Sequence, residues 1–504
     1  MPVGDAPAAV LPPPSAPELQ GGVVPDGWIG QIPVFYEVEP QRSDGKIAAG
    51  LTCRVGMADE PLPQRGISHL VEHLTLSAMT GTSERHNGFV DQMTTNFVVH
   101  GTPAEVAGYF ATVCAALAAP DAARLPLETQ VLRAEAARRG SDTAASIMNW
   151  RTGASGYGAL AYRELFLERP NIDWLRYWIA RYFTADNAVF WCTGPIPDGL
   201  SLPLPAGERR PTPEPVWLPE QYPAWNVDEV GGVVLSLIRS ASVVDSVAVE
   251  VARTRLFDQL RVKLGLSYDV GVRSDELGTG QVHTLLHADC VPAQAVKVRD
   301  AFVTELRRLG LYGPTDDEVA RVTSSVARSI SESDGSDVAS RARAHLLGRP
   351  FLSSDEVLAA MGSIDTVTVR DRLESMADTA LWVVPGEVGW RDHRYVQLRP
   401  WSTTWATGVP TPIAVPATPE DRRSIAYDVS CITVFLDPEF RCPVTVEFER
   451  CAALVCSTNG SRSLVGADGF TVLIEPAHWA NGAALVEWVD RRVPAERIVV
   501  MSES

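Results

Sequence analysis

The sequence predicts an α+β fold with two homologous domains, each a mainly antiparallel sheet flanked by helices, followed by a small β-rich module. Apolar runs of strand length alternate with helix-like stretches through most of the chain. Proline-rich stretches at about 203–224 and 399–420 divide it. The segments 185–196 and 377–388, which end the two domains, carry Ala, Asp, Ala and Gly at the same offsets. We interpret this as an internal duplication; the alternative is a chance likeness between two buried strands that follow helices.

The predicted domains are 26–205, 225–398 and, for the β-rich module, 421–504, after a disordered Pro/Ala-rich leader at 1–25. In the first domain, apolar periodicity predicts strands at 46–56, 94–101 and 187–194 and helices at about 66–79, 103–118, 126–139, 157–167 and 172–183. In the second domain it predicts strands at 231–240, 266–274, 280–290 and 380–386 and helices at about 243–264, 293–309, 315–333, 336–348 and 364–376. The module is strand-rich and ends in a helix-like NGAALVEWVDRRV and a strand RIVVM.

Composition indicates a soluble globular protein. The chain has 504 residues, of which 45% are hydrophobic and 21% are charged. Its net charge of −18 argues against nucleic-acid binding through a basic surface. No run approaches the roughly 18 consecutive apolar residues of a membrane span, so we expect no membrane insertion. The first residues have neither the basic start nor the apolar centre of a secretory signal, so we expect a cytoplasmic protein.

The eight cysteines follow no disulfide framework, and we expect buried free thiols. Four of them come late in the chain, at Cys431, Cys442, Cys451 and Cys456, within or beside strand-like runs. A second metal site formed by these four is the alternative to buried thiols.

The most informative segment begins at Gly66 and reads GISHLVEH. On a helix, His69 and His73 are four residues apart on one face, so both imidazoles can reach one zinc ion. Glu72 can point at a metal-bound water and take its proton as that water attacks a carbonyl. This H-x-x-E-H order is the reversed zinc-peptidase motif. The alternative is that two of the nine histidines fell at this spacing by chance.

A catalytic zinc site needs a third protein ligand and an open position for water. The predicted helix at 126–139 offers Glu128 and Glu135, which are seven residues apart. Seven residues are two helical turns, so both carboxylates lie on one face of that helix. The alternative is that both are surface glutamates on an Arg-rich helix.

With these motifs, the chain resembles the pitrilysin/insulinase family of zinc metallopeptidases, in the two-domain form that is similar to mitochondrial processing peptidases. In that family the inverted motif is followed downstream by a helix with E-x6-E, and the second Glu binds zinc. The resemblance therefore implies that His69, His73 and Glu135 hold Zn²⁺ and that Glu128 orients a ligand or the helix. The gap between His73 and Glu135 is shorter here than is usual for the family.

Further matches extend the resemblance over roughly residues 28–395. Asn96, in TTNFVVHG, matches an Asn on the family's edge strand, which binds the substrate backbone by strand addition. Phe97 departs from the small residue that is usual there. In RLFDQLRVKLGLSYDVGV, Arg261 and Tyr268 match a pair that contacts substrate opposite the zinc. Without this match, the pair would be interpreted as a helix-end Arg and a core strand Tyr.

The resemblance implies a zinc endopeptidase that cleaves unfolded peptides inside a clamshell chamber, with leader or other processed peptides as candidate substrates. Glu72 would act as general base, and Tyr268 and Arg261 would stabilise the oxyanion or anchor the substrate. Such chambers contain four homologous domains, so we expect a homodimer or a heterodimer with a related subunit. The alternative is a non-catalytic scaffold or partner subunit of such a heterodimer. For the module at 421–504 we expect a docking or dimerisation role.

Overall fold

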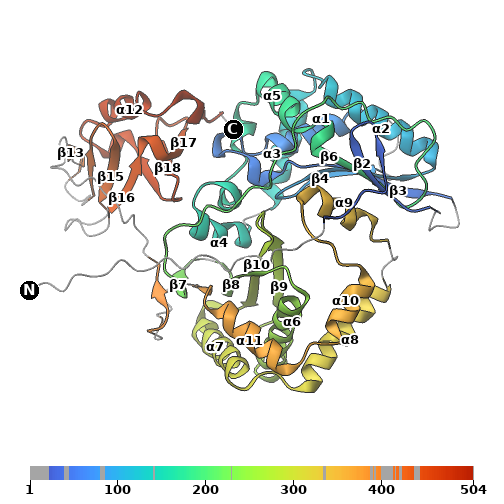
Figure 1. Cartoon of the computed structure of the whole chain (residues 1–504). Coiled ribbons are helices and arrows are strands. Elements are labelled where there is room, and N and C mark those ends of the chain that lie inside the picture. Colours follow the sequence, from blue (N-terminus) through green and yellow to red (C-terminus); the bar gives the residue numbers. More distant parts are fainter. Residues whose placement is uncertain are drawn as a thin grey trace, which may run out of the picture. The chain divides into compact units, whose positions relative to one another are not determined.

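A computed structural model gives the fold of the chain (Figure 1). The structure describes residues 22–38, 45–79, 86–139, 142–228, 230–332, 336–385, 390, 393–398, 413–414, 416–418, 423–435 and 443–502. Most of the predicted leader, much of the second proline-rich stretch and Cys442 lie outside these residues. Within the described ranges, every helix is too short or too polar to span a bilayer. The seven cysteines that the structure describes are free thiols.

The first six-stranded sheet has the order β1-β2-β6-β3-β5-β4, and all neighbours are antiparallel except β2 and β6. Its strands are β1 Gly27–Ile29, β2 Ile32–Tyr36, β3 Ile47–Cys53, β4 His86–Val90, β5 Thr95–Gly101 and β6 Ala188–Cys192. Three helices bury their apolar sides in the core of this sheet, namely α1 Ile67–Leu76, α2 Pro103–Ala118 and α5 Ile172–Tyr182. Two more helices follow α2 in the chain, α3 Leu125–Arg139 and α4 Thr143–Thr152.

The opposite face of this sheet is covered by α9, Val338–Leu347, which comes from much later in the chain. Successive strand residues point to opposite faces, so Phe35 and Val189 face away from the core that α1 joins. The side chains of α9 that pack on them are four residues apart on one helical face: Val338, Ala342 and Leu346. The first sheet is therefore a layer with α1, α2 and α5 on one face and α9 on the other.

The second six-stranded sheet repeats the plan of the first. Its order is β12-β7-β11-β8-β10-β9, with parallel pairs only at β12/β7 and β7/β11. Its strands are β7 Ala224–Val227, β8 Gly232–Ser240, β9 Val270–Glu276, β10 Gln281–Asp289, β11 Leu381–Val384 and β12 Val396–Gln397. The helices of this region are α6 Val243–Phe257, α7 Ala295–Tyr312, α8 Asp316–Glu332, α10 Ser354–Met361 and α11 Thr366–Ala377. Five strands in each sheet share chain order, neighbours and direction, which confirms two homologous α+β domains.

The C-terminal region forms the predicted β-rich module, with two four-stranded sheets of order β13-β14-β15-β16 and β19-β18-β17-β20. Its elements are β13 Ile413–Ala414, β14 Ser424–Tyr427, β15 Cys431–Phe435, β16 Pro443–Glu447, β17 Cys451–Cys456, β18 Arg462–Gly466, β19 Thr471–Ile474, α12 Gly482–Asp490 and β20 Ile498–Val500. Side chains from both sheets and from α12 share one apolar core, so the module has an interior of its own.

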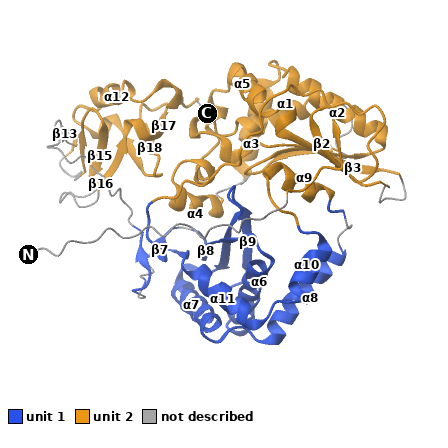
Figure 2. Ribbon diagram, viewed as in Figure 1, with its two compact units in different colours: residues 1–21, 219–337, 352–398 blue, residues 22–218, 338–351, 399–504 orange. Residues whose placement is uncertain are grey.

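The chain divides into two compact units (Figure 2). One consists of Met1–Gly21, Pro219–Asp337 and Leu352–Leu398, and the other of Gly22–Leu218, Val338–Phe351 and Arg399–Ser504. The second of these units, drawn in orange, therefore contains the first sheet, α9 and the C-terminal module. The sequence boundaries at 205, 225, 398 and 421 remain predictions.

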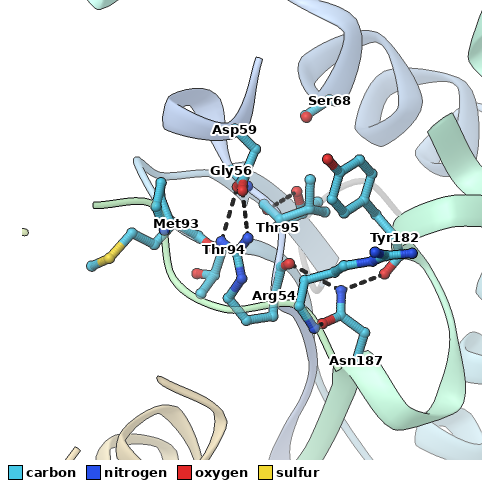
Figure 3. A network of polar contacts seen from close by, with 12 residues as sticks. Arg54, Gly56, Asp59, Ser68, Met93, Thr94, Thr95, Tyr182 and Asn187 are labelled. Carbon is cyan, nitrogen blue, oxygen red and sulfur yellow. Dashed lines mark hydrogen bonds and ion pairs between the residues drawn. The ribbon is translucent and has the colours of Figure 1, made fainter. Parts of the chain in front are cut away.

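A buried arginine fixes the loop that leads from β3 into the motif helix (Figure 3). Arg54 is 1% exposed; its Nη1 donates to Asp59 Oδ2 and to the carbonyl of Met93, each at 2.9 Å. Its Nη2 also pairs with the other Asp59 oxygen. Asn187, directly before β6, bonds to the backbone of the same residue: Arg54 N donates to Asn187 O at 2.8 Å, and the Asn187 side chain donates from Nδ2 to Arg54 O at 3.0 Å. The guanidinium of Arg54 thus joins the loop to the β4–β5 turn, and the backbone of Arg54 joins both to the residue before β6.

A second buried carboxylate marks the start of α1. Glu60 Oε1 accepts from the backbone N–H of Ser68 at 2.9 Å, and its Oε2 accepts from Gly66 N at 2.9 Å and Arg65 Nη1 at 2.8 Å. Backbone N–H groups at a helix start lack partners within the helix and carry partial positive charge, so a carboxylate there is favourable. Gly66 has φ of +95°, a left-handed conformation that suits glycine. These contacts set where α1 begins and which way it points.

The Arg54 network gives the first test. Arg54→Met should lower the free energy of unfolding by about 3–5 kcal/mol, because Asp59 would keep a buried charge without its partner. Urea denaturation of the unit that contains the first sheet would measure the change. The control is Arg176→Met, which breaks an exposed pair with Asp173 and should cost at most about 1 kcal/mol. Equal losses in the free energy of unfolding of the two variants would show that the buried pair stabilises the fold no more than the exposed pair does.

Candidate metal centre

Helix α1 presents the two motif histidines to the same point in space. His69 and His73 lie one turn apart, their ring centroids are 5.0 Å apart and their side chains are 12% and 21% exposed. Glu135 Oε2, from α3, lies 3.7 Å from Nε2 of each histidine. Ligand atoms about 2.0–2.2 Å from a tetrahedral zinc ion lie about 3.3–3.6 Å apart. The three atoms are therefore close to the spacing that one such ion requires, and two imidazoles with one carboxylate suit zinc.

Glu72 stands beside this cluster. Its side chain is 5% exposed, and its Oε2 lies 3.8 Å from His73 Nε2. One ligand atom each from His69, Glu72 and His73 falls within 4.8 Å of the others. A carboxylate at this distance can accept a proton from a water held between it and the cluster.

The two glutamates of α3 have different positions. Glu128 Oε2 lies 3.5 Å from His73 Nδ1, the ring nitrogen that points away from Glu135, and Arg124 Nη2 donates to Glu128 Oε1 at 2.6 Å. Glu128 is buried, whereas the Glu135 side chain is 45% exposed and faces the cavity. Both carboxylates lie on one face of α3, but only Glu135 lies beside the Nε2 atoms of the two histidines.

A residue that the sequence analysis missed contacts the other histidine. Glu164 Oε1 lies 3.0 Å from His69 Nδ1, and the Glu164 side chain is 9% exposed. It directly precedes the short helix η4, Leu165–Glu168. A Cβ atom on Gly66 would lie 2.7 Å from Glu164 Cβ, so the glycine before α1 permits this close approach. No regular spacing in the sequence connects Glu164 to the motif. The glycine at position 66 is an indirect sign that another segment approaches the start of α1 closely.

Burial, and next the neighbouring His69, lower the pKa of the His73 imidazole, while Glu135 and Glu128 act in the opposite direction. The net effect favours the neutral ring, which is the form that binds a metal ion. Carboxylates lie beside Nδ1 of both rings, Glu164 at His69 and Glu128 at His73, and they favour the tautomers that carry the proton on Nδ1 and keep Nε2 as the acceptor that can bind a metal ion.

The expectation that Asn96 lies on an edge strand is wrong. Its strand, β5, pairs with β3 on one side and with β4 on the other, so its backbone has no free edge. The Asn96 side chain is 7% exposed; its Oδ1 accepts from Thr52 Oγ1 and its Nδ2 donates to Thr94 Oγ1, each at 2.9 Å. A strand-like sequence does not reveal whether the strand is central or peripheral, because the sheet order depends on distant segments.

The first sheet has two edge strands, β1 and β4, and β4 pairs with β5 and with no other strand that the structure describes. It borders a cavity of about 610 Å³ that also contains the histidine cluster. The cavity is lined by Met57, His69, Glu72, His73, Leu76, Ser77, Asn87, Gly88, Phe89, Val90, Arg124, Glu128 and Glu135. A Cβ atom on Gly88 would lie 2.5 Å from Glu72 Oε1, so β4 runs directly against the acidic side chain. The free edge and the cluster therefore share one cavity.

Arg261 and Tyr268 lie in the other compact unit. Arg261, in the π-helical turn η6 Asp258–Lys263, donates from Nη1 to the Tyr268 carbonyl at 2.7 Å, and its Cζ lies 4.5 Å from the centre of the Tyr268 ring. Asp289 Oδ1 accepts from the backbone N–H of Tyr268 at 2.8 Å. Tyr268 is 75% exposed, so the interpretation of it as a core residue is wrong. Arg261 and Tyr268 therefore form one contacting pair at the surface, where a partner could reach both side chains.

Comparisons with known proteins place the fold. Residues 233–326 match the family model described as Peptidase M16 inactive domain. No curated protein matches the chain in sequence. The first half of the periplasmic protease PqqL from Escherichia coli is similar in structure, with a TM-score of 0.56 and 15% identity over 73% of this chain and 94% of that one. The chain therefore shares the fold of M16 peptidases.

Two further solved structures support the same conclusion. The peptidase M16 inactive domain from Pseudomonas fluorescens has a TM-score of 0.59 and 14% identity over 71% of this chain and 97% of that one. Pitrilysin has a TM-score of 0.53 and 17% identity over 71% of this chain, but the match covers 44% of pitrilysin. This chain thus corresponds to less than half of that larger protein.

The contact between β4 and α1 can be tested by a single methyl group. Gly88→Ala should destabilise the first sheet by about 1–3 kcal/mol, because the new Cβ would overlap Glu72 and Leu76. Thermal unfolding and amide hydrogen exchange of β4 would measure the change. The control is Gly108→Ala in α2, where a Cβ meets nothing within 4 Å and the helix should gain up to about 1 kcal/mol. Unchanged exchange in β4 after Gly88→Ala would contradict the close approach.

Proposed function

We propose that this protein is a zinc-dependent endopeptidase that cleaves unfolded peptides. The observation that carries the proposal is the convergence of His69 Nε2, His73 Nε2 and Glu135 Oε2 in a cavity that also holds Glu72 and the free edge of β4. Metal ligands, a base and a peptide-binding edge are the three parts that metal-assisted peptide hydrolysis needs.

His69, His73 and Glu135 would hold Zn²⁺, and the donor set and spacing fit that ion. Bound there, zinc would supply Lewis acidity, polarising a peptide carbonyl and lowering the pKa of water. Glu164 and Glu128 would keep the two imidazoles in place by accepting their Nδ1–H hydrogens. Such carboxylate–histidine pairs orient ligands and raise their basicity.

Glu72 would move the proton. As general base it would accept a proton from the attacking water, and it would then return that proton to the leaving amine. Its burial next to Gly88 and Leu76 restricts its rotamers and holds the carboxylate towards the cavity.

The edge of β4 would bind the substrate. An extended peptide can add to a free strand edge through backbone hydrogen bonds, which a folded substrate cannot do. Asn87, Gly88, Phe89 and Val90 of β4 line the cavity, so a peptide paired there would pass beside Glu72. This assigns to β4 the role that the sequence analysis gave to the strand of Asn96.

Arg261 and Tyr268 would contact the substrate from a second subunit. Both side chains are accessible and coupled to each other, and this chain spans 44% of pitrilysin. A dimer, either of two copies or with a related subunit, would supply the missing half. In it, the phenol and guanidinium of one subunit would stabilise negative charge on the oxygen of a peptide carbonyl held beside Glu72 of the other. A cytoplasmic location and processed or leader peptides as substrates remain predictions from the sequence.

The second candidate function is a non-catalytic partner subunit. The match of residues 233–326 to a model named for an inactive domain favours it. That match lies in the second homologous domain and includes neither α1 nor α3. The candidate metal ligands His69, His73 and Glu135 and the candidate base Glu72 all lie outside the matched region. We therefore keep the catalytic function as the first proposal.

Replacing the proposed base, Glu72, distinguishes its role in peptide hydrolysis from a role in zinc binding. Glu72→Gln should bind zinc as the wild type does but hydrolyse a mixed peptide library about 100-fold to 10,000-fold more slowly, because a general base contributes that much. Mass spectrometry of the products, with and without a chelator, would measure the rates. Full activity in the variant would remove Glu72 as base. Zinc binding without any wild-type cleavage would favour the partner-subunit function.

The two glutamates of α3 can be distinguished by zinc content. Glu135→Gln should lose stoichiometric zinc on dialysis, because it removes one of three protein ligands. Glu128→Gln should keep zinc with about 10-fold to 100-fold weaker affinity, because it acts through His73. Elemental analysis and chelator competition would measure both. The reverse order of effects would make Glu128 the ligand.

A further inference from the structure

The C-terminal module packs on the segment that carries Glu164. One apolar cluster joins the two, and it is separate from the module's own core. Its buried members are Leu62, Ala154, Ala159 and Leu165 from the first domain and Ala453, Val465 and Val499 from the module. Leu165 directly follows Glu164, so the cluster reaches the neighbour of the residue that contacts His69.

Hydrogen bonds fix this docking at the end of α4. Ala154 N donates to Ala467 O at 3.0 Å, and Tyr162 Oη donates to Gly469 O at 3.1 Å. Gly153, just before them, has φ of +66°, and a Cβ atom there would lie 2.0 Å from Ala467 O. Glycine thus allows the two backbones to approach directly. The module is therefore in specific contact with residues on the N-terminal side of Glu164.

A second set of hydrogen bonds lies on the C-terminal side of Glu164. Ser502 Oγ donates to Glu168 Oε2 at 2.9 Å. Arg133 Nη2 donates to Leu167 O at 2.6 Å and to Ser502 Oγ at 3.1 Å. Arg133 belongs to α3, two residues before Glu135, so the end of the module contacts both segments that bring carboxylates to the cluster.

The inner side of the same segment is held by the turn that precedes α1. Phe166 N donates to Arg65 O at 2.9 Å, next to the start of the motif helix. Glu164 thus lies on a short stretch fixed on one side by the first domain and on the other by the module. A carboxylate so held keeps a constant position relative to His69.

We propose that the C-terminal module is a positioning element of the metal centre: it supplies no ligand but holds residues 154–168 so that Glu164 orients His69. This inference rests on the proposed zinc site. It predicts that undocking the module weakens zinc binding although none of the ligands changes.

The test uses the full chain with a charge placed in the interface. Ala453 is fully buried in the interface cluster, outside the module's own core, so Ala453→Glu should undock a module that remains folded. The dissociation constant for zinc, from chelator competition, should rise about 10-fold to 100-fold, and amides of 154–168 should exchange faster in the metal-free protein. Thr471→Glu, which adds the same charge at an exposed position of β19, should change neither quantity.

A double-mutant cycle separates positioning from general destabilisation. Glu164→Gln alone should also raise the zinc dissociation constant, and adding Ala453→Glu should raise it little further, because both act through one contact. A multiplicative effect of the two changes would overturn the inference. Tyr162→Phe, which removes the bond to Gly469 O and the bond that Tyr162 Oη accepts from Asn149 Nδ2, is the milder second variant and should shift both readouts in the same direction.

The outcomes distinguish this inference from the proposed function. A wild-type chain that binds no zinc would overturn the proposed function and the inference with it. A wild-type chain that binds zinc, with affinity and hydrogen exchange unaltered by Ala453→Glu, would overturn the inference alone.

Discussion

The position at which α1 begins is the constraint on which the candidate site depends. Glu60 satisfies the N–H groups at the helix start, and Gly66 adopts the left-handed turn that leads into it. Apolar residues of α1 then enter the core, and the opposite face carries His69 and His73. A helix that began one residue later would rotate that face by about 100° and separate the histidines from α3.

The two homologous domains show how one topology carries different chemistry. In the first, α1 connects β3 to the β4–β5 hairpin; in the second, α6 and the turn η6 connect β8 to the β9–β10 hairpin. α6 contains no histidine, and the region that follows it presents Arg261 and Tyr268 instead. The fold therefore fixes where a functional helix sits, and the side chains decide what it can do.

Local patterns were sufficient to predict several features of the site. The four-residue spacing of the histidines and the seven-residue spacing of Glu128 and Glu135 each place side chains on one helical face, and the structure brings both faces together. The repeated ending at 185–196 and 377–388 indicated the duplication that the two sheets display.

Features that depend on distant segments could not be predicted. Whether β4 or β5 lies at the edge is set by the order of the whole sheet, so Asn96 was misplaced. Glu164 reaches His69 only because η4 is packed between α1 and the module. Likewise, α9 covers the first sheet although it lies in the chain between α8 and α10, two helices of the second domain, and its apolar stripe does not specify which sheet it meets.

The most direct measurement is an anomalous-scattering map of crystals grown with zinc, recorded at the zinc absorption edge. The account predicts one peak per chain, about 2.0–2.2 Å from His69 Nε2, His73 Nε2 and an oxygen of Glu135, with Glu128 and Glu164 bound to the other ring nitrogens. A peak coordinated elsewhere, or no peak at this cluster in zinc-saturated crystals, would contradict the account.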